Sequence, residues 1–406
     1  MDLQLIGARV RGERERAGLN QRELAERAGL SQPTLARIEL GTRPRLTIAE
    51  LDSIAGVLEI PLRDLTSGNP VRERVRVAAR MSEVSDGARE AALRRAVDLL
   101  VLDDRLDRFG DGLGTRLCEP TVDLPHPDPR ASVEDQGRLL AAAVRTTLDL
   151  GGAPIADPAE LAERLTGVHT AVVDFPEGID GYTLTDPDRG VTLIVVGTSA
   201  ITERQRFTFA HELGHLLFGD GAGMHNVDGG RTPAERRCDA FARHLLAPQE
   251  GIRAWLGAAE ISLDERVCGL LTRHFRVSLK VLLIQLERMG LLSRAQAEAL
   301  SGPTGAQLAR RYGWGRQYER EQEIGRTIRP PQRLLERATE AYRAGKVGVR
   351  VLAGLEGRDP VEMEAALADA GITPVVPQIR YVDVNRLLAR TRSLEAGHES
   401  PANKEA

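Results

Sequence analysis

The sequence predicts a multidomain α+β protein: an all-α unit at the N-terminus, a central unit that mixes helices and strands, and a mostly helical C-terminal extension. Three observations lead to this prediction. The chain has 406 residues, enough for about two to four domains of ordinary size. Residues 3–66 carry helical periodicity and dense helix caps. Strand-like runs occur further on, at 169–175 and 191–196.

Composition and charge exclude several classes of protein. Hydrophobic residues make up 42% and charged residues 28%, which excludes collagen-like, low-complexity and wholly disordered chains. No apolar run is long enough for a transmembrane helix and no secretory signal begins the chain, so no membrane partner is expected. The three cysteines, Cys118, Cys238 and Cys268, are too far apart for a disulfide framework or a CxxC pair. The expected compartment is therefore the reducing cytoplasm.

The chain is expected to divide into four parts. Residues 1–66 form the helical unit, which ends at a Ser-Gly-Asn-Pro break. Residues 67–131 are a helical connector followed by a linker rich in Gly and Pro. Residues 132–292 form the mixed unit. Residues 293–406 form the helical extension, whose tail after residue 392 is expected to be mobile.

Helix caps define the elements of the N-terminal unit. Gly18 is placed to end a first helix, and Asn20 and Ser31 are placed to begin the second and third. Thr47 begins a fourth helix with a capping box, and a fifth begins near Pro61. The sequence therefore predicts five short helices around one small core.

The second and third of these helices have the arrangement of a helix-turn-helix. A tight turn at Gly29 joins them, and Ala25 is small where they would touch. Gln and Arg side chains can read base edges in the major groove. The third helix presents three polar candidates: Gln32, Thr34 and Arg37. Phosphate contacts are expected from its neighbours Gln21, Arg43 and Arg45. The alternative is an αα packing module with a polar third helix.

The stretch from Gln21 to Gly41 resembles the XRE (Cro/C1-type) repressor domains. The resemblance covers nearly all of residues 3–66. It implies a five-helix domain whose third helix enters the major groove of double-stranded operator DNA. Such domains usually bind as dimers, so a homodimer is expected.

The central unit contains a His-Glu-Leu-Gly-His string with metal-ligand spacing. His211 and His215 are four residues apart, so on a helix they share one face and can bind one Zn²⁺. Glu212 beside them can act as a general base toward a water that the metal activates. The alternative is a structural or degenerate site.

Zinc needs a third protein ligand, and Glu235 is the preferred candidate. It lies in the first turn of a helix predicted over 233–246, and Asp239 one turn later can accept a bond from the N–H of a ligand His. Glu235 could instead close a capping box with Thr232. Other candidates follow the histidines in the chain, with His225 as the main rival: Asp220, His225, Asp228 and Asp239.

Segments 203–217 and 235–248 together resemble the ImmA/IrrE metallopeptidase family, as does the stretch 178–182. The resemblance implies a zincin-like fold in which zinc is held by His211, His215 and Glu235, and in which Glu212 is the catalyst. The family's Asn is commonly expected where this chain has Asp239.

Two neighbouring side chains receive separate expectations. Tyr182 is considered as an oxyanion donor because it precedes the site on a strand-like segment. Cys238 shares its helix with apolar residues, so a buried cysteine is expected rather than a ligand.

Together these features predict a cytoplasmic transcriptional regulator that also carries a zinc-dependent endopeptidase. In the resembled family the peptidase cuts a repressor, so the expected substrate is a partner protein such as a repressor. In this chain the DNA-binding and cutting units share one polypeptide. Two alternatives stay open: a regulator whose zincin-like unit is a non-catalytic sensor, and a toxin–antitoxin component.

Overall fold

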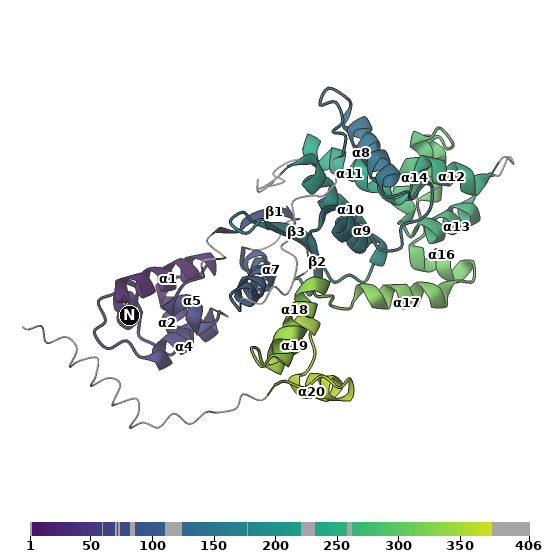
Figure 1. Cartoon of the computed structure of the whole chain (residues 1–406). Helices are drawn as coiled ribbons and strands as arrows, with labels where there is room; N and C mark the ends of the chain where they lie inside the picture. The colour runs from purple at the N-terminus through teal and green to yellow at the C-terminus, as the bar shows by residue number, and fades with distance from the viewer. Residues whose placement is uncertain are drawn as a thin grey trace, which may run out of the picture.

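The computed structural model describes residues 2–58, 60–69, 71, 74–81, 86–109, 124–176, 178–220, 232–257 and 262–375. A helical N-terminal unit, a mixed centre and a helical C-terminal region confirm the multidomain α+β prediction (Figure 1). Most of the predicted Gly- and Pro-rich linker and the predicted mobile tail lie outside the described residues.

Among the residues that the structure describes, five helices form the N-terminal unit. Their bounds are α1 Leu3–Arg16, α2 Gln21–Arg27, α3 Gln32–Glu39, α4 Ile48–Val57 and α5 Leu62–Thr66. The side chains of Asn20, Ser31 and Thr47 each accept a hydrogen bond from a backbone N–H three residues later. Gly18 has a φ of 67°, the left-handed conformation that follows the end of α1. The helix starts therefore lie where the caps predict them.

A buried ion pair holds α3 against the first two helices. Arg14 Nε donates to Glu39 Oε1 at 2.6 Å, and Arg14 Nη2 donates to Glu39 Oε2 at 3.1 Å. The Glu39 side chain is only 2% exposed. Gln21 Nε2 adds a third bond to Glu39, at 2.8 Å. The end of α3 is therefore fixed in place by contacts within the unit itself.

Within the described ranges, the centre of the molecule is a four-stranded mixed sheet in the order β1-β3-β4-β2. The strands are β1 Arg76–Met81, β2 His169–Val173, β3 Ile179–Asp186 and β4 Val191–Gly197. β2 runs parallel to β4, whereas β3 runs antiparallel to both β4 and β1. The two runs predicted as strands correspond to β2 and β4. β1 differs from the helical pattern predicted for the connector, because its pairing partner lies far away in the chain.

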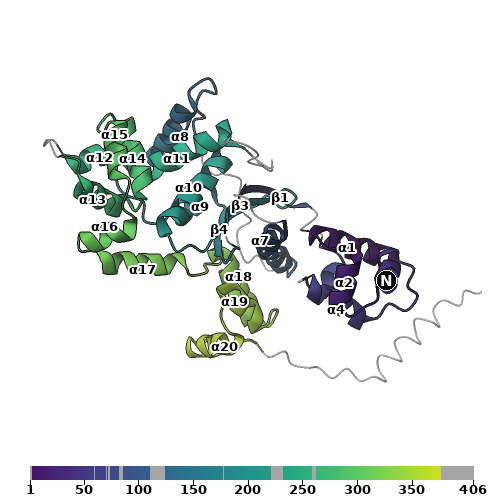
Figure 2. The same cartoon turned by 180° about the vertical axis from the view of Figure 1, so that it is seen from behind.

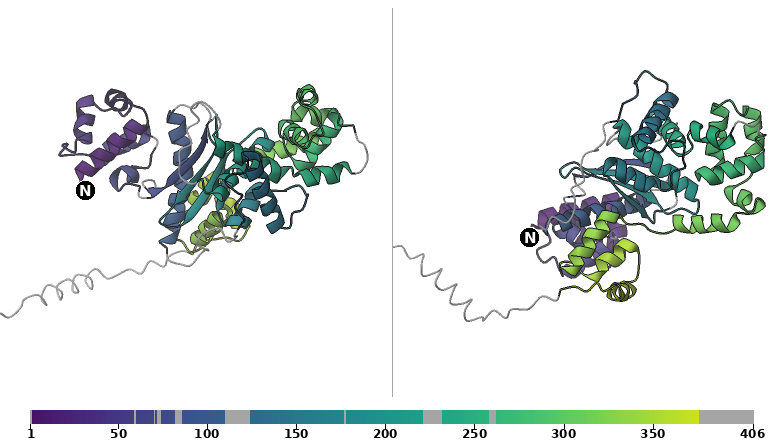
Figure 3. Two further views of the ribbon diagram at one scale, coloured as in Figure 1. Left: turned by 90° about the horizontal axis from the view of Figure 1, so that it is seen from above. Right: turned by 45° about the vertical axis from the view of Figure 1, so that its right-hand side comes forward.

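Helices cover both faces of the sheet (Figure 3). Helix α7, Asp86–Asp107, packs on one face in a core shared with Tyr182, Leu184 and Leu193. The opposite face carries α8 Val133–Thr147, α9 Pro158–Thr166, α10 Thr202–Phe218 and α11 Pro233–Leu246. On that side Ile194 and Val196 share the main core with apolar residues of α10 and α11. The segment predicted as a connector thus supplies one strand and one covering helix to this layered unit.

The C-terminal helices form two groups. The first extends the main core and comprises α12 Gln249–Leu256, α13 Glu265–Phe275, α14 Leu279–Arg288, α15 Arg294–Leu300, α16 Gly305–Arg311 and α17 Gly315–Gly325. The second, α18 Gln332–Arg343, α19 Val349–Glu356 and α20 Pro360–Asp369, packs around Leu106 at the end of α7 (Figure 2). Leu308 and Trp314 are buried in the main core, which therefore continues past residue 292. No described helix has the length and apolar character needed to cross a membrane.

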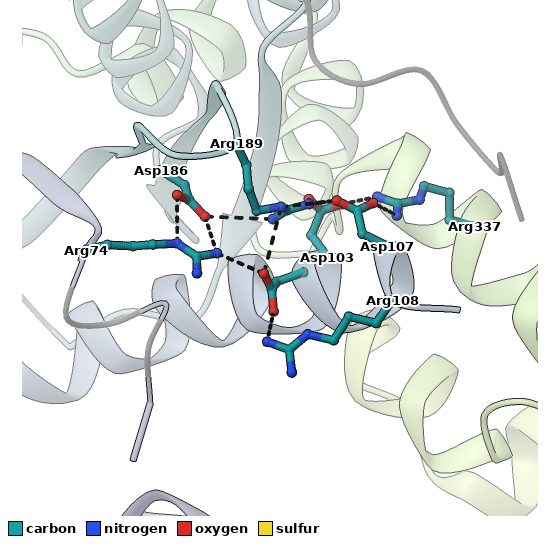
Figure 4. Close-up of polar contacts among 8 residues, drawn as sticks. Arg74, Asp103, Asp107, Arg108, Asp186, Arg189 and Arg337 are labelled. Atoms are coloured by element: carbon teal, nitrogen blue, oxygen red, sulfur yellow. Dashed lines mark hydrogen bonds and ion pairs between the residues drawn. The ribbon is translucent and has the colours of Figure 1, made fainter. Parts of the chain in front are cut away.

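Arginine–aspartate pairs bind α7 to its neighbours (Figure 4). Arg189, between β3 and β4, donates to Asp103 of α7 at 2.6 Å. Arg337 of α18 binds the same carboxylate from the other side. Arg74, just before β1, donates to Asp186 at the end of β3 at 2.7 Å. Because Asp103 and Asp186 are almost fully buried, these pairs cannot separate without a large desolvation cost, and they fix the layers relative to one another.

Glu134 joins α8 to α11 and gives the fold a measurable pH dependence. Its carboxylate accepts bonds from Arg243 and from His244, the latter at 2.9 Å. Burial alone would raise the pKa of Glu134, but these partners lower it to about 2. Its folded pKa is below the unfolded value of about 4.3, so ionised Glu134 stabilises the fold above that value. This stabilisation is lost as the pH falls from about 5 toward 2.

We therefore expect chelator-treated wild-type protein to lose stability more steeply between pH 6 and pH 3 than a Glu134→Gln variant. Urea-unfolding midpoints measured across this range check the prediction. Parallel pH profiles for the two proteins would contradict it.

Candidate functional site

Two histidines and a glutamate converge where α10 meets α11. His211 and His215 lie one turn apart on α10, with their Nε2 atoms 3.0 Å from each other. Glu235, in the first turn of α11, places Oε2 3.2 Å from His211 Nε2 and Oε1 3.1 Å from His215 Nε2. All three side chains are buried. The residues predicted as ligands are therefore brought together at one point between two helices.

The cap at the start of α11 and the position of the Glu235 carboxylate are separate features. The Thr232 hydroxyl accepts a bond from the Glu235 backbone N–H at 3.2 Å, so the helix is capped. The Glu235 carboxylate turns toward the histidines of α10 instead of closing a capping box. The cap fixes the first turn of α11 and so directs the carboxylate at α10.

Each histidine also has a carboxylate beside Nδ1, the ring nitrogen that faces away from the cluster. His211 Nδ1 lies 2.9 Å from Asp239 Oδ1, one turn after Glu235 on α11. His215 Nδ1 lies 3.2 Å from Asp220 Oδ2. Such partners orient imidazole rings so that Nε2 points inward. Asp239 thus lies beside His211, whereas Asp220, one of the rival ligand candidates, lies behind His215.

The electrostatics of this cluster favour a cation at its centre. Burial disfavours a charged His215, yet hydrogen bonds to Asp220, Cys238 and Glu235 raise its pKa to about 12. Burial also works to raise the pKa of Glu235, but His211 and His215 hold it well below its usual range. A cluster that attracts protons this strongly has the donor types and the charge to hold a divalent metal ion.

Glu212 follows His211 on α10, and one of its carboxylate oxygens has no hydrogen-bond partner in the described part of the chain. Its side chain is almost fully buried, and Oε2 accepts a hydrogen bond from Thr183 Oγ1 of β3 at 2.7 Å. Oε1 has no hydrogen-bond partner among the described residues. A buried carboxylate oxygen without a partner is costly, and such oxygens occur at functional sites. Sequence reasoning missed Thr183, because only the crossing of β3 over α10 brings it to Glu212.

Cys238 belongs to a second group of metal-ligand types, with His215 and Asp220. Burial raises the pKa of its thiol to about 11, so the neutral thiol is favoured. Asp220 is also paired with Arg237. Cys238 is fully buried, as expected, and this group is a weaker metal candidate than the first.

Tyr182 does not join the site, and two rival ligand candidates cannot be placed because they lie outside the described residues. Tyr182 lies in the core beneath α7, where its ring meets Phe175 edge-on, whereas its neighbour Thr183 faces α10. Successive residues of a strand point to opposite faces, so Tyr182 cannot serve as the oxyanion donor considered for it. His225 and Asp228 lie outside the described residues.

The candidate DNA-reading residues fall into two groups. Gln32 and Arg37 are exposed on α3, as is Arg45 beyond it. Thr34 is half-buried, with its hydroxyl 2.9 Å from the hydroxyl of the cap residue Ser31. Gln21 is bonded to Glu39 at 2.8 Å, and Arg43 Nε to Glu50 at 3.2 Å. The first group can meet DNA directly, whereas Gln21 and Arg43 are already held by carboxylates.

Comparison with known families distinguishes the same two units, the N-terminal helical unit and the central unit with the histidines. Residues 10–65 match the family model described as helix-turn-helix, and residues 166–287 match the M78 peptidase model, described as the IrrE N-terminal-like domain. The chain joins a helix-turn-helix domain to an IrrE N-terminal-like domain. The helix-turn-helix domain contains every DNA-binding candidate, and the IrrE N-terminal-like domain contains the whole histidine–carboxylate cluster. The matches indicate a DNA-binding regulator with a peptidase-like domain, and both expected resemblances are confirmed.

A comparison with solved structures finds the apo form of the competence regulator ComR from Streptococcus vestibularis. It is 13% identical, and the alignment covers 80% of this chain and 99% of that chain with a TM-score of 0.16. A score this low does not establish a shared fold for the helix-turn-helix and IrrE N-terminal-like domains together. No curated protein matches the chain.

Proposed function

We propose that this protein is a transcriptional regulator that binds operator DNA through α3 and cuts a partner protein with a zinc-dependent endopeptidase. One observation carries the enzymatic part: His211, His215 and Glu235 converge, and the buried Glu212 that follows His211 has one oxygen without a partner among the described residues. The substrate is expected to be a single partner protein, such as an XRE-type repressor or the chain itself.

The spacing of the donor atoms supports zinc. Ligands about 2.0–2.2 Å from a tetrahedral Zn²⁺ lie about 3.3–3.5 Å from one another. The distances between the donor atoms of His211, His215 and Glu235 are 3.0–3.2 Å, close to this value. Three protein ligands leave one tetrahedral position open, which is the arrangement of catalytic rather than structural zinc sites. When bound, zinc would lower the pKa of a water molecule and polarise a peptide carbonyl.

The residues around the three donor side chains have different proposed roles. Glu212 Oε1 is placed to take a proton from the attacking water and to return it to the departing amine. Thr183 holds Oε2, so that Oε1 keeps one orientation. Asp239 and Asp220 lie behind the two histidines and keep their Nε2 atoms directed inward.

The experiment that tests this proposal compares wild-type protein with a Glu212→Gln variant. Each is assayed for bound metal and for cleavage of proteins made in the same cells, with XRE-type repressors and the chain itself as the first candidates. Reproducible cleavage by wild type alone supports an endopeptidase. Normal promoter regulation by the variant would favour the alternative of a non-catalytic sensor.

The DNA-binding part of the proposal separates base-reading from phosphate contacts. Arg37 is exposed on α3, so Arg37→Ala should cost about 1–3 kcal/mol on a selected operator and relax the base preference. Arg45→Ala should weaken binding to all duplexes alike. It should also reduce the slope of the logarithm of the binding constant against the logarithm of the salt concentration by about one. Arg43→Ala should act in the same direction but less strongly, because Arg43 is paired with Glu50.

Fluorescence anisotropy at several salt concentrations, with the selected duplex and a scrambled one, checks these values. The selected duplex should be near-palindromic, with half-sites about one helical turn apart, if two copies bind together. If joint substitution of Gln32, Thr34 and Arg37 lowered the affinity for both duplexes equally, the assignment of α3 as the reading helix would be wrong.

A further inference from the structure

Strand β1 occupies the edge of the sheet that lies next to Glu212. In the antiparallel pair of β1 and β3, Ala78 lies opposite Thr183. Thr183 is the residue whose hydroxyl binds the Glu212 carboxylate at 2.7 Å. Neighbouring strands are about 4.8 Å apart, so the backbone of β1 runs one strand spacing from the strand that touches Glu212.

The backbone of β3 itself crosses α10 closely. A Cβ atom placed on Gly181 would lie 3.1 Å from Thr208 Cγ2, one turn before His211. In the order β1-β3-β4-β2, β3 would be the edge strand if β1 were absent. A free edge offers unpaired N–H and C=O groups, with which an extended peptide can pair through its main chain. The outer edge of β3 is therefore the place where a substrate segment could pair beside Glu212, and β1 fills it.

A clamp holds β1 in this position (Figure 4). Arg74, just before β1, donates from Nε to Asp186 Oδ1 at 2.8 Å and from Nη2 to Asp186 Oδ2 at 2.7 Å. Its Nη2 also donates to Asp104 of α7 at 2.8 Å. Asp186 is the last residue of β3 and is 0% exposed. This bidentate geometry fixes the start of β1 to the end of β3 and to the helix beneath the sheet.

The same strand follows directly on the helix-turn-helix domain. Only a short connection separates the end of α5 at Thr66 from the start of β1 at Arg76. A second tie runs from Arg94 of α7 to the backbone carbonyl of Leu58, at 2.6 Å. A displacement of the helix-turn-helix domain would therefore act on β1 and its clamp.

We infer that β1 is an inhibitory strand of the chain itself: it occupies the edge of β3 on which an extended peptide substrate binds, and it must leave before a substrate segment can pair. The inference rests on the proposed endopeptidase function, whose regulation it describes. The displacement of β1 needs no catalysis, so it can be measured separately.

Peptide capture by full-length Glu212→Gln protein measures whether the edge is open. The probe is a fluorescein-labelled peptide with the sequence of residues 74–81, followed by anisotropy. Adding Arg74→Met should strengthen binding by at least about tenfold, because the clamp is lost. Adding Ala78→Pro with Ala79→Pro should do the same, since neighbouring residues alternate in donating to β3 and at least one bond is removed. Arg95→Met, which removes an arginine of α7 that binds Asp174, is the matched control and should leave binding unchanged.

A disulfide between β1 and β3 tests the opposite change, in which β1 is locked in place instead of released. Arg76 and Thr185 are paired across β1 and β3. Paired residues of antiparallel strands are about 4.5–5.5 Å apart at Cα, within disulfide range. Arg76→Cys with Thr185→Cys, in a Cys118→Ser background, should abolish peptide capture when oxidised and restore it on reduction. With Glu212 intact, Arg74→Met should cleave a test protein about tenfold faster than wild type, and the oxidised disulfide form should not cleave.

Two results would overturn the inference: peptide capture by the oxidised disulfide form equal to that of the reduced form, or no gain in capture in either opened variant while circular dichroism and metal content stay normal. Failure of the proposed endopeptidase looks different. In that case the opened variants capture the peptide as expected, but no form of the protein with Glu212 intact cleaves anything.

Discussion

A Glu212→Gln variant is expected to cleave its protein substrate about 100- to 10,000-fold more slowly than the wild type while keeping its metal. The amide has the size of the carboxylate and can still accept the hydrogen bond from Thr183. It cannot take a proton, so in the proposed mechanism the attacking water loses its base. Single-turnover cleavage of an identified substrate, with metal content measured on the same samples, checks both halves of the prediction.

The matched control is Glu203→Gln, which changes another acid of α10. Glu203 accepts a hydrogen bond from Gln322 at 3.2 Å, and among the described residues no hydrogen bond or ion pair joins it to the histidine–carboxylate cluster. It should keep the wild-type cleavage rate. Cleavage by Glu212→Gln at the wild-type rate would contradict the assignment of Glu212 as the base.

Loss of the metal is the second large effect. Wild-type protein should hold about one Zn²⁺ per chain after dialysis, and His211→Ala should hold none, because two protein ligands rarely retain zinc. Glu235→Ala should also lose the metal, since its carboxylate faces both histidines at 3.1–3.2 Å. Asp239→Ala should retain the metal with about 10- to 100-fold weaker affinity, because it acts through His211. Elemental analysis and competition with a chelator measure these differences.

A Thr232→Ala variant distinguishes the capping of α11 from the metal binding proposed for Glu235. It removes the helix cap of α11 and should cost about 1 kcal/mol of stability while leaving the metal bound. Full metal occupancy in a His211→Ala, His215→Ala double variant would contradict the site. Undiminished affinity after Glu235→Ala would instead make His225 the third ligand.

The sequence predicts best those features whose causes are local. Asn20, Ser31 and Thr47 lie three residues from the backbone groups that they cap, so the helix starts of the helix-turn-helix domain could be read directly. Helix α11 begins at Pro233 and ends at Leu246, as predicted, because Thr232 caps it. The spacing of His211 and His215 is likewise a property of one helix.

Features that depend on distant pairs could not be predicted. Thr183 and Glu212 are 29 residues apart, and nothing in either neighbourhood marks the hydrogen bond between them. Arg74 and Asp186 are separated by 112 residues, so the clamp on β1 is visible only in the folded chain. The place of Asp220 is different: it is only five residues from His215, and it lies behind that ring at Nδ1 rather than beside Nε2 with the other donors, which the spacing alone does not tell.

The order of β1 and β3 along the chain has a consequence for synthesis. A ribosome adds about 5–20 residues per second, and β3 follows β1 by roughly 100 residues, so β1 emerges about 5–20 s before its partner. The five described N-terminal helices have a core of their own, made of residues within 6–65, so they can fold as a unit during this interval. In each newly made chain the helix-turn-helix domain can therefore fold before β1 pairs with β3, so the pairing of these two strands is the later step.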